Sequence, residues 1–340
     1  MVSNKLRLVN RVVVIALVSC VALVSAACAA KSPSAQPLTQ APTAAPSSAT
    51  AAPSAPANPT GTAAPPTTEP AATSAPPSKT APPAKPVHLS SLQSDDTQWG
   101  VAMPIIVWMD VLPKSTVDFV KNTTVTVNGE PATGAWFWEA TTHAGAAVEG
   151  HYRQKNFWPA HATIEVTFPS AGTAAGPGLA FDGKLSSLTF QTGPATIGRV
   201  DGATSKLTVT SDGKVWNTFP VALGAPATPT MSGTKVIMAK IPMESMDGMQ
   251  VPWSLRLTNS GEYLHAAPWN IGNINAGVPS SNGCTNMLPA DAQTLFNFMQ
   301  IGDPVIYTNV PGKVMPVWDG YGDWNLNWAA WAAGGQFRNH

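Results

Sequence analysis

The 340-residue sequence contains little charge and carries no excess of either sign. Asp, Glu, Lys and Arg make up 11 % of the chain, where globular proteins have about 25 %. The 19 basic and 19 acidic residues balance, so the chain lacks the strongly basic surface on which many nucleic-acid binders depend. Nucleic acid is therefore not an expected partner.

Aromatic residues are absent from residues 28–87. This segment holds fifteen of the 33 prolines, and all twelve tryptophans of the chain follow it. A Pro/Ala/Ser/Thr segment without aromatics cannot bury enough apolar surface to offset the entropy of ordering it. We expect a disordered tether biased towards polyproline II over residues 28–87, with the globular part starting near His88.

The N-terminus has the layout of a signal peptide, which we assign to residues 1–27. Three basic residues precede an apolar run over residues 12–24, and three small residues follow at 25–27. The basic residues are Lys5, Arg7 and Arg11. The apolar run is shorter than the roughly 20 residues of a membrane span. The sequence therefore predicts export.

Cys28 directly follows those small residues, an arrangement that resembles a bacterial lipobox and implies a lipidated cysteine. Cys20 after Leu17-Val18-Ser19 is the alternative lipidation site, and ordinary cleavage is a further one. We expect the protein to be anchored through its lipid to the outer face of the cytoplasmic membrane, in the cell envelope.

Residues 88–193 show short strand patterns separated by turns. Period-2 runs at this spacing predict a small immunoglobulin-like sandwich without an internal disulfide. The runs are 105–109, 124–127, 135–139, 162–168 and 185–191. His143, His151 and His161 lack metal-ligand spacing, so we assign them surface or packing roles.

Residues 194–309 form a second β-rich unit. Asp212-Gly213 separates two strand patterns and supplies the positive φ of a tight turn. Residues 242–252 read as a long loop bounded by prolines, either a lid over a site or a surface loop. One clear helix runs from Pro289 to a stop at Gly302.

Residues 310–340 form a Trp-rich extension. Trp324, Trp328 and Trp331 are spaced by four and three, which places them on one face of a helix. We expect this face to pack on the second unit. The fold class is thus mainly β, with one clear helix and a Trp-rich C-terminal subdomain.

The candidate site lies between His265 and Asn286. If Cys20 leaves with the signal peptide and Cys28 is acylated, Cys284 is the remaining thiol. A nucleophilic thiol needs a base or cation beside it, and a Gly-containing turn lets backbone N–H groups face an oxyanion. One His at a strand end and a Gly before the Cys suggest acyl transfer.

This stretch resembles the L,D-transpeptidases with a YkuD-type catalytic domain. His265 is followed by fifteen residues and then by Ser281-Asn282-Gly283-Cys284-Thr285-Asn286, which matches the His…Ser/Thr-His-Gly-Cys-x-Asn motif in spacing. The sandwich domain and the Trp-rich tail resemble the actinobacterial and mycobacterial lipoprotein members. The resemblance implies an immunoglobulin-like domain followed by a β-rich catalytic domain.

The resemblance also implies residue roles. Cys284 is then the nucleophile, His265 its base, and the Ala266 carbonyl orients the imidazole. Gly283 and Cys284 supply backbone N–H groups to the oxyanion. The substrate-binding candidates are Asn286, Trp269, Asn282 and Ser281. The implied donor is a peptidoglycan stem peptide, joined to another stem in a 3→3 cross-link through a cysteine thioester. Carbapenem β-lactams are expected acylating inhibitors, and neither cofactor nor metal is expected.

Asn282 departs from the motif, since most members have a second histidine there. An amide cannot titrate or shuttle a proton, although it still forms hydrogen bonds. Lipoprotein members that share the Trp-rich tail resemble this sequence in having Asn at this position, so we interpret it as a subfamily trait. We hypothesise that His265 alone governs the ionisation of Cys284 and that Asn282 positions the loop.

Two other functions stay open on the sequence. Water in place of the amine acceptor would make the protein an L,D-carboxypeptidase, because no acceptor-side motif is recognisable. A catalytic domain made inactive by Asn282 would leave a peptidoglycan-binding scaffold.

Overall fold

The computed structural model describes residues 82–246 and 248–337, all within one compact unit that spans residues 76–340. The predicted signal peptide, the two candidate lipidation sites and nearly all of the predicted tether lie outside the described residues. Among the described helices, none has the length and apolar character needed to cross a membrane.

The first domain is an immunoglobulin-like sandwich, as expected. One sheet has the order β2-β4-β8-β7 and the other the order β3-β11-β9-β5-β6. The first sheet consists of β2 (Leu89–Ser91), β4 (Ile105–Met109), β7 (Gly134–Glu139) and β8 (Val148–Gln154). The second consists of β3 (Gln98–Trp99), β5 (Thr124–Val127), β6 (Glu130–Pro131), β9 (Thr163–Thr167) and β11 (Ser187–Thr192).

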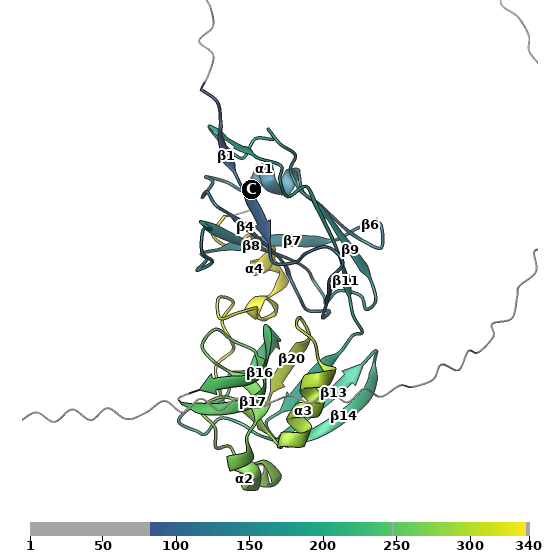
Figure 1. The fold of residues 1–340 in the computed structure, drawn as a ribbon, viewed down its shortest axis with the longest axis vertical. Coiled ribbons are helices and arrows are strands. Elements are labelled where there is room, and N and C mark those ends of the chain that lie inside the picture. The colour runs from purple at the N-terminus through teal and green to yellow at the C-terminus, as the bar shows by residue number, and fades with distance from the viewer. Residues whose placement is uncertain (1–81, 247, 338–340) are drawn as a thin grey trace, which may run out of the picture. The chain divides into compact units, whose positions relative to one another are not determined.

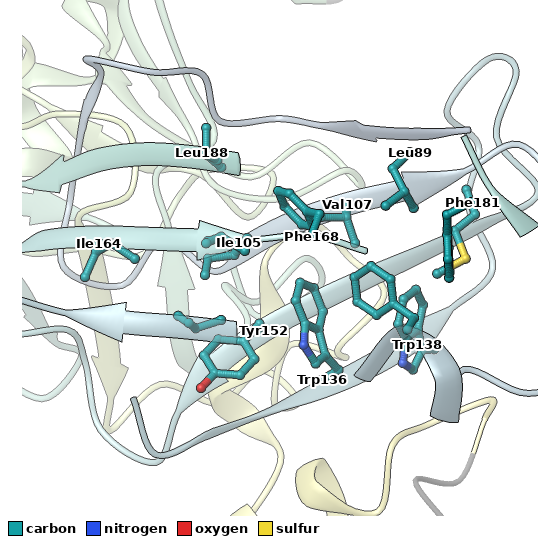
Figure 2. Packing of buried hydrophobic residues seen from close by; sticks show 14 of the residues in the cluster. Leu89, Ile105, Val107, Trp136, Trp138, Tyr152, Ile164, Phe168, Phe181 and Leu188 are labelled. Carbon is teal, nitrogen blue, oxygen red and sulfur yellow. The ribbon is translucent and has the colours of Figure 1, made fainter. Parts of the chain in front are cut away.

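Alternating apolar residues of both sheets form the core of this domain (Figure 2). The short helix α1 (Val117–Lys121) buries Phe119 edge-on against the rings of Trp136 and Trp138, with ring centroids 5.0 and 5.2 Å apart. Such edge-to-face contacts are a favoured aromatic geometry. A cluster of this kind closes the sandwich without a disulfide.

The folded part begins a few residues before the predicted boundary at His88. Strand β1 (Lys85–Val87) pairs in parallel with β10 (Leu179–Phe181), and Val87 is fully buried. The end of the segment predicted to be a tether is therefore part of the first domain. Proline at position 86 is compatible with a strand of this kind, because an edge position does not require its missing N–H.

The second domain is built on a nine-stranded mixed sheet (Figure 1). Its strand order is β15-β20-β12-β13-β14-β19-β18-β17-β16. The strands are β12 (Ile197–Asp201), β13 (Lys206–Ser211), β14 (Lys214–Ala222), β15 (Gly233–Val236), β16 (Ala239–Met246), β17 (Met249–Arg256), β18 (Tyr263–Ala266), β19 (Thr285–Met287) and β20 (Pro304–Thr308). The predicted helix is α3 (Pro289–Phe298), which packs on β17 and β18.

Two smaller helical segments connect β18 to β19: the 3₁₀ turn η1 (Pro268–Asn270) and α2 (Ile271–Ala276). The predicted Asp212-Gly213 turn joins β13 to β14, with φ of 46° and 78°. The predicted loop over residues 242–252 is instead a β-hairpin made by β16 and β17, in which Met243 pairs with Pro252 and Ser245 with Gln250. The prolines did not prevent pairing, because Pro242 lies in the edge strand β16 and Pro252 lies in the part of β17 that pairs with β16 but not with β18.

The Trp-rich extension, which we expected to pack on the second domain, contacts both domains. Asn325 donates a hydrogen bond to the Thr234 carbonyl in the second domain (3.0 Å). The indole N–H groups of Trp324 and Trp331 donate to the carbonyls of Ala102 and Ala135 in the first domain, at 2.9 Å each. The extension thus fastens the two domains together.

The three tryptophans also do not share one helix. Trp324 lies in the 3₁₀ segment η2 (Gly322–Asn325), whereas Trp328 and Trp331 lie in α4 (Trp328–Ala332). They converge instead on the guanidinium of Arg153 in β8, whose Cζ lies 4.8, 5.6 and 4.4 Å from the three ring centroids. Burial lowers the pKa of Arg153 to about 10, which still leaves it charged at neutral pH. The spacing of these tryptophans therefore did not predict either their separate helical segments or their contact with Arg153.

We expect the substitution Trp331→Ala to destabilise the folded unit by about 3 kcal/mol. Trp331 is fully buried, stacks on Phe137 with ring centroids 4.8 Å apart and donates its indole N–H to Ala135. Urea unfolding measures the effect, with the exposed Trp318→Ala as the control of the same residue type. An unfolding midpoint equal to that of the control would contradict the packing role.

Candidate active site

The candidate site is the wall formed by two neighbouring parallel strands, β18 and β19. His265 pairs with Asn286 in this register, and Leu264 pairs with Thr285. Because side chains alternate across a strand, Tyr263 and His265 face the same side as Cys284 and Asn286. All four line a cavity of about 550 Å³.

The turn before β19 depends on glycine. Gly283 has a φ of 107°, a conformation that L side chains rarely adopt. Its carbonyl accepts a 2.8 Å hydrogen bond from the buried hydroxyl of Thr230. Within the described part of the chain, neither the amide N–H of Gly283 nor that of Cys284 donates a hydrogen bond to a backbone carbonyl. These two amides are the ones expected to serve the oxyanion.

His265 is buried, and its ring orientation is fixed by its own strand. Its Nδ1 lies 2.9 Å from the Ala266 carbonyl, to which an N–H at Nδ1 donates, so Nε2 is left as the acceptor. Burial lowers the pKa of His265 below its ordinary value, and the hydrogen bond to Ala266 opposes that effect. The ring of Trp269 lies beside the imidazole of His265, with the two ring centroids 6.1 Å apart.

Cys284 is partly buried, and its Sγ contacts the Gly261 carbonyl at 3.6 Å. Burial raises the pKa of the thiol to about 11; the Tyr263 amide and Lys235 act to lower this pKa, and Glu262 acts to raise it. In the described structure no hydrogen bond joins the thiol to His265. The resting site therefore holds a neutral thiol and a neutral imidazole on one cavity wall.

The four predicted substrate-binding residues all line the cavity, but they differ in environment. Asn286 is buried, and its Oδ1 has no hydrogen-bond partner among the described residues. Trp269 is half exposed. Ser281 is buried and bonds the Cys284 carbonyl through its hydroxyl at 2.5 Å, so it holds the turn. Asn282 is exposed and forms no hydrogen bond within the described part of the chain, which does not support the loop-positioning role that we hypothesised for it.

Sequence reasoning missed a buried ion pair next to the turn that contains Gly283. Lys235 in β15 is fully buried and contacts the carboxylate of Glu262, which also accepts a hydrogen bond from the Met231 amide at 2.8 Å. A side-chain carbon placed on Gly283 would lie 3.5 Å from this carboxylate. Neither residue lies in the motif, and the strand order that joins them was not visible in the sequence.

The tip of the β16–β17 hairpin also lines the cavity, through Ser245, Met246 and Met249. We expect that replacing residues 246–249 by Asn-Gly, a favoured two-residue turn, will slow acylation by a β-lactam about tenfold while leaving the melting temperature nearly unchanged. Met249 is half exposed, so its loss removes little buried surface. Acylation kinetics and thermal unfolding measure the two effects, and a collapse in stability would contradict the assignment.

Comparison with known proteins agrees with this geometry. Residues 196–306 match the YkuD family, and residues 60–174 match the bacterial Ig domain. The matched YkuD region is described as the L,D-transpeptidase catalytic domain and contains both His265 and Cys284. This part of the chain is thus similar to an L,D-transpeptidase catalytic domain, and it follows a part similar to a bacterial Ig domain.

Matches to relatives and solved structures cover most of this chain. The chain is 28 % identical over 266 residues to L,D-transpeptidase 2 of Mycobacterium tuberculosis, a match that covers 73 % of this chain and 63 % of the relative. It thus spans somewhat less than two thirds of that relative's length. An L,D-transpeptidase structure from Mycobacterium smegmatis has a TM-score of 0.52 and 26 % identity, covering 66 % of this chain and all of that one. A structure of the L,D-transpeptidase LdtMt1 in complex with imipenem has a TM-score of 0.53 and 23 % identity, covering 67 % and 100 %, and shares the fold.

Proposed function

We propose that this protein is a peptidoglycan L,D-transpeptidase that forms 3→3 cross-links through a thioester on Cys284. The observation that carries the proposal is that His265 and Cys284 line the same wall of one cavity. A buried imidazole with Nε2 free as acceptor, a thiol and two amide N–H groups occur at the strand ends of an L,D-transpeptidase domain. These are the groups that acyl transfer through a covalent intermediate requires.

In the proposed first half-reaction, Nε2 of His265 takes the thiol proton as Sγ attacks the carbonyl carbon of the third stem residue. The amides of Gly283 and Cys284 stabilise the oxyanion. The amide bond to the terminal D-Ala then breaks, His265 returns the proton to the departing amine, and a thioester remains. A side-chain amine of a second stem attacks that thioester, forms the new amide and releases the Cys284 thiol.

The unpartnered Asn286 Oδ1 supports a polar contact to the donor stem. It is an acceptor buried at the cavity wall, and a buried acceptor left without a donor costs about 1–3 kcal/mol. A backbone or side-chain N–H of the stem would remove that cost. Trp269, half exposed beside His265, supplies an apolar face on the same wall.

Carbapenems are the proposed inhibitors, because a β-lactam carbonyl presents the thiol with the same type of acyl group. A protein of this fold has been solved in complex with imipenem. We also propose that the enzyme is exported and anchored by a lipid on Cys28, with the residues between Cys28 and β1 as a spacer. A polyproline II chain of that length extends at most about 180 Å at about 3.1 Å per residue.

Intact-mass analysis of the purified protein with disaccharide-tetrapeptide muropeptides tests the proposal. We expect a thioester adduct on Cys284, release of D-Ala and formation of 3→3-linked dimers. Release of D-Ala without dimers would replace the proposal with an L,D-carboxypeptidase. Absence of any adduct, with a carbapenem as well as with muropeptides, would replace it with a peptidoglycan-binding scaffold.

A further inference from the structure

A cluster of potential metal ligands lies in the first domain, outside the cavity that contains Cys284. Glu149 and His151 lie two residues apart on β8 and so face the same side of the sheet, and Glu139 on β7 is paired directly opposite Glu149. One ligand atom from each of the three residues lies within 4.8 Å of the others. Like charges directly opposite one another destabilise a sheet, so the two carboxylates need positive charge between them, which either a protonated His151 or a bound cation supplies.

Neighbouring residues hold His151 in the orientation of a metal ligand. The imidazole is buried, and its Nδ1 lies 3.0 Å from the carboxylate of Asp323, which is fully buried in η2. Its Nε2 points at the two glutamates, 2.7 Å from Glu149 Oε1 and 3.8 Å from Glu139 Oε1. A carboxylate on the far ring nitrogen is the usual partner of a metal-binding histidine.

Glu149 is fixed in the same manner from outside the cluster. The indole N–H of Trp108 and the hydroxyl of Thr141 both donate to its Oε2, each at 2.6 Å. Oε1 is thereby turned towards His151 Nε2. The carboxylate of Glu139, in contrast, accepts no hydrogen bond from any described residue, and its nearest charged partner is His151 at 3.8 Å.

The two carboxylates of the cluster are accessible from solvent, whereas the imidazole of His151 is buried. Glu139 and Glu149 line a cavity of about 470 Å³, which also has Thr141 and Tyr321 on its wall. An ion entering this cavity would meet both carboxylates and would keep its remaining coordination positions open to water. This cavity shares no lining residue with the cavity that contains Cys284.

We propose that Glu139, Glu149 and His151 bind a divalent cation of the zinc type. One imidazole and two carboxylates suit zinc, whose bonds to such ligands are about 2.0–2.2 Å long, so that ligand atoms of one tetrahedral ion stand a little over 3 Å apart. His151 Nε2 lies 3.8 Å from Glu139 Oε1 and at a hydrogen-bond distance of 2.7 Å from Glu149 Oε1, so a bound ion would displace the proton that Nε2 donates to Glu149 and would move the two groups slightly apart. Through Asp323 the ion would couple the first domain to the C-terminal extension. This site is independent of the proposed transpeptidase activity.

Titration of the chelator-treated full chain with zinc chloride in a calorimeter tests the proposal. We expect one site, with affinity lowered at least tenfold in Glu139→Gln and unchanged in Glu165→Gln, an exposed glutamate of β9. Thermal unfolding of the metal-free variants checks that both are folded. Zinc should also raise the melting temperature of the wild type more than that of Glu139→Gln.

A cysteine variant separates this site from the thiols of the chain. Zinc binding at the proposed site persists in Cys284→Ala, and cobalt bound there gives no thiolate charge-transfer absorption. Absence of zinc binding in the full chain would overturn the proposal. Binding that is lost in Cys284→Ala and retained in Glu139→Gln would also overturn it, because the metal would then lie at the catalytic cavity.

Discussion

The substitution Cys284→Ala will abolish acylation by carbapenems and muropeptides, lowering the rate by at least about 10³-fold, while the folded unit stays stable. The thiol is partly exposed, and its contact with the Gly261 carbonyl is a weak hydrogen bond of 3.6 Å. Intact-mass spectrometry and thermal unfolding measure the two quantities. An adduct on the folded variant would place the nucleophile elsewhere.

The substitution His265→Gln tests whether His265 acts as the base that takes the proton of the Cys284 thiol. Glutamine keeps a hydrogen-bonding amide but cannot take a proton, so we expect acylation to slow by about 10²–10⁴-fold. His161→Gln is the matched control, because His161 is an exposed histidine of the first domain paired with Asp212. Equal rates in the two variants would remove His265 from the mechanism.

The pH profile of acylation follows from the same two groups. Burial lowers the pKa of His265 and raises that of Cys284 to about 11, so both groups are neutral at pH 7. Protonation of His265 removes the base. The acylation rate should therefore fall only as pH drops below the ordinary histidine pKa of about 6.5, and should stay level from there to mildly alkaline pH. A fall that begins above pH 7 would contradict this assignment.

The architecture and the motif were predictable from local patterns. Period-2 runs indicated the sandwich, Asp212-Gly213 indicated the β13–β14 hairpin of the second domain, and Pro289 marked the start of α3. The motif spacing placed His265 near Cys284 because His265 lies in β18 and Cys284 directly precedes β19, which pairs with β18 in parallel. Strand periodicity and turn residues are read from neighbouring positions, and the motif is read from the fixed spacing between His265 and Cys284.

Long-range pairing was not predictable. The loop assigned to residues 242–252 forms a hairpin because β16 adds to the edge of a sheet whose strand order the sequence does not state. Trp331 packs on Phe137 rather than on the second domain for the same reason. The cluster of Glu139, Glu149 and His151 forms across the paired strands β7 and β8, so the sequence spacing of the histidines could not indicate it.

The ion pair between Lys235 and Glu262 is the second feature with large expected effects. Both groups are buried, which lowers the pKa of Lys235 and raises that of Glu262; their mutual attraction opposes each shift. Lys235 Nζ also lies 3.9 Å from the centre of the Tyr307 ring, and the Tyr307 hydroxyl lies 2.8 Å from that of Thr285 in β19. Through Tyr307, the ion pair is therefore connected to β19, the strand that begins directly after Cys284.

Removing one partner leaves the other charge buried without compensation. We expect Lys235→Met to destabilise the fold by about 3–5 kcal/mol, and the double variant Lys235→Met/Glu262→Gln to recover much of that loss. Urea unfolding of the single and double variants measures the coupling between the two sites. Additive effects would show that the pair does not act as a unit.

The same variants should move the reactivity of the thiol in opposite directions. Glu262 acts to raise the pKa of Cys284 and Lys235 acts to lower it. Glu262→Gln should therefore lower the thiol pKa and speed alkylation of the Cys284 peptide by iodoacetamide at a fixed alkaline pH, whereas Lys235→Met should slow it. A purely structural pair would shift both rates the same way, since a loosened turn exposes the thiol in either variant. Opposite shifts would show that the buried pair sets the electrostatic environment of Cys284.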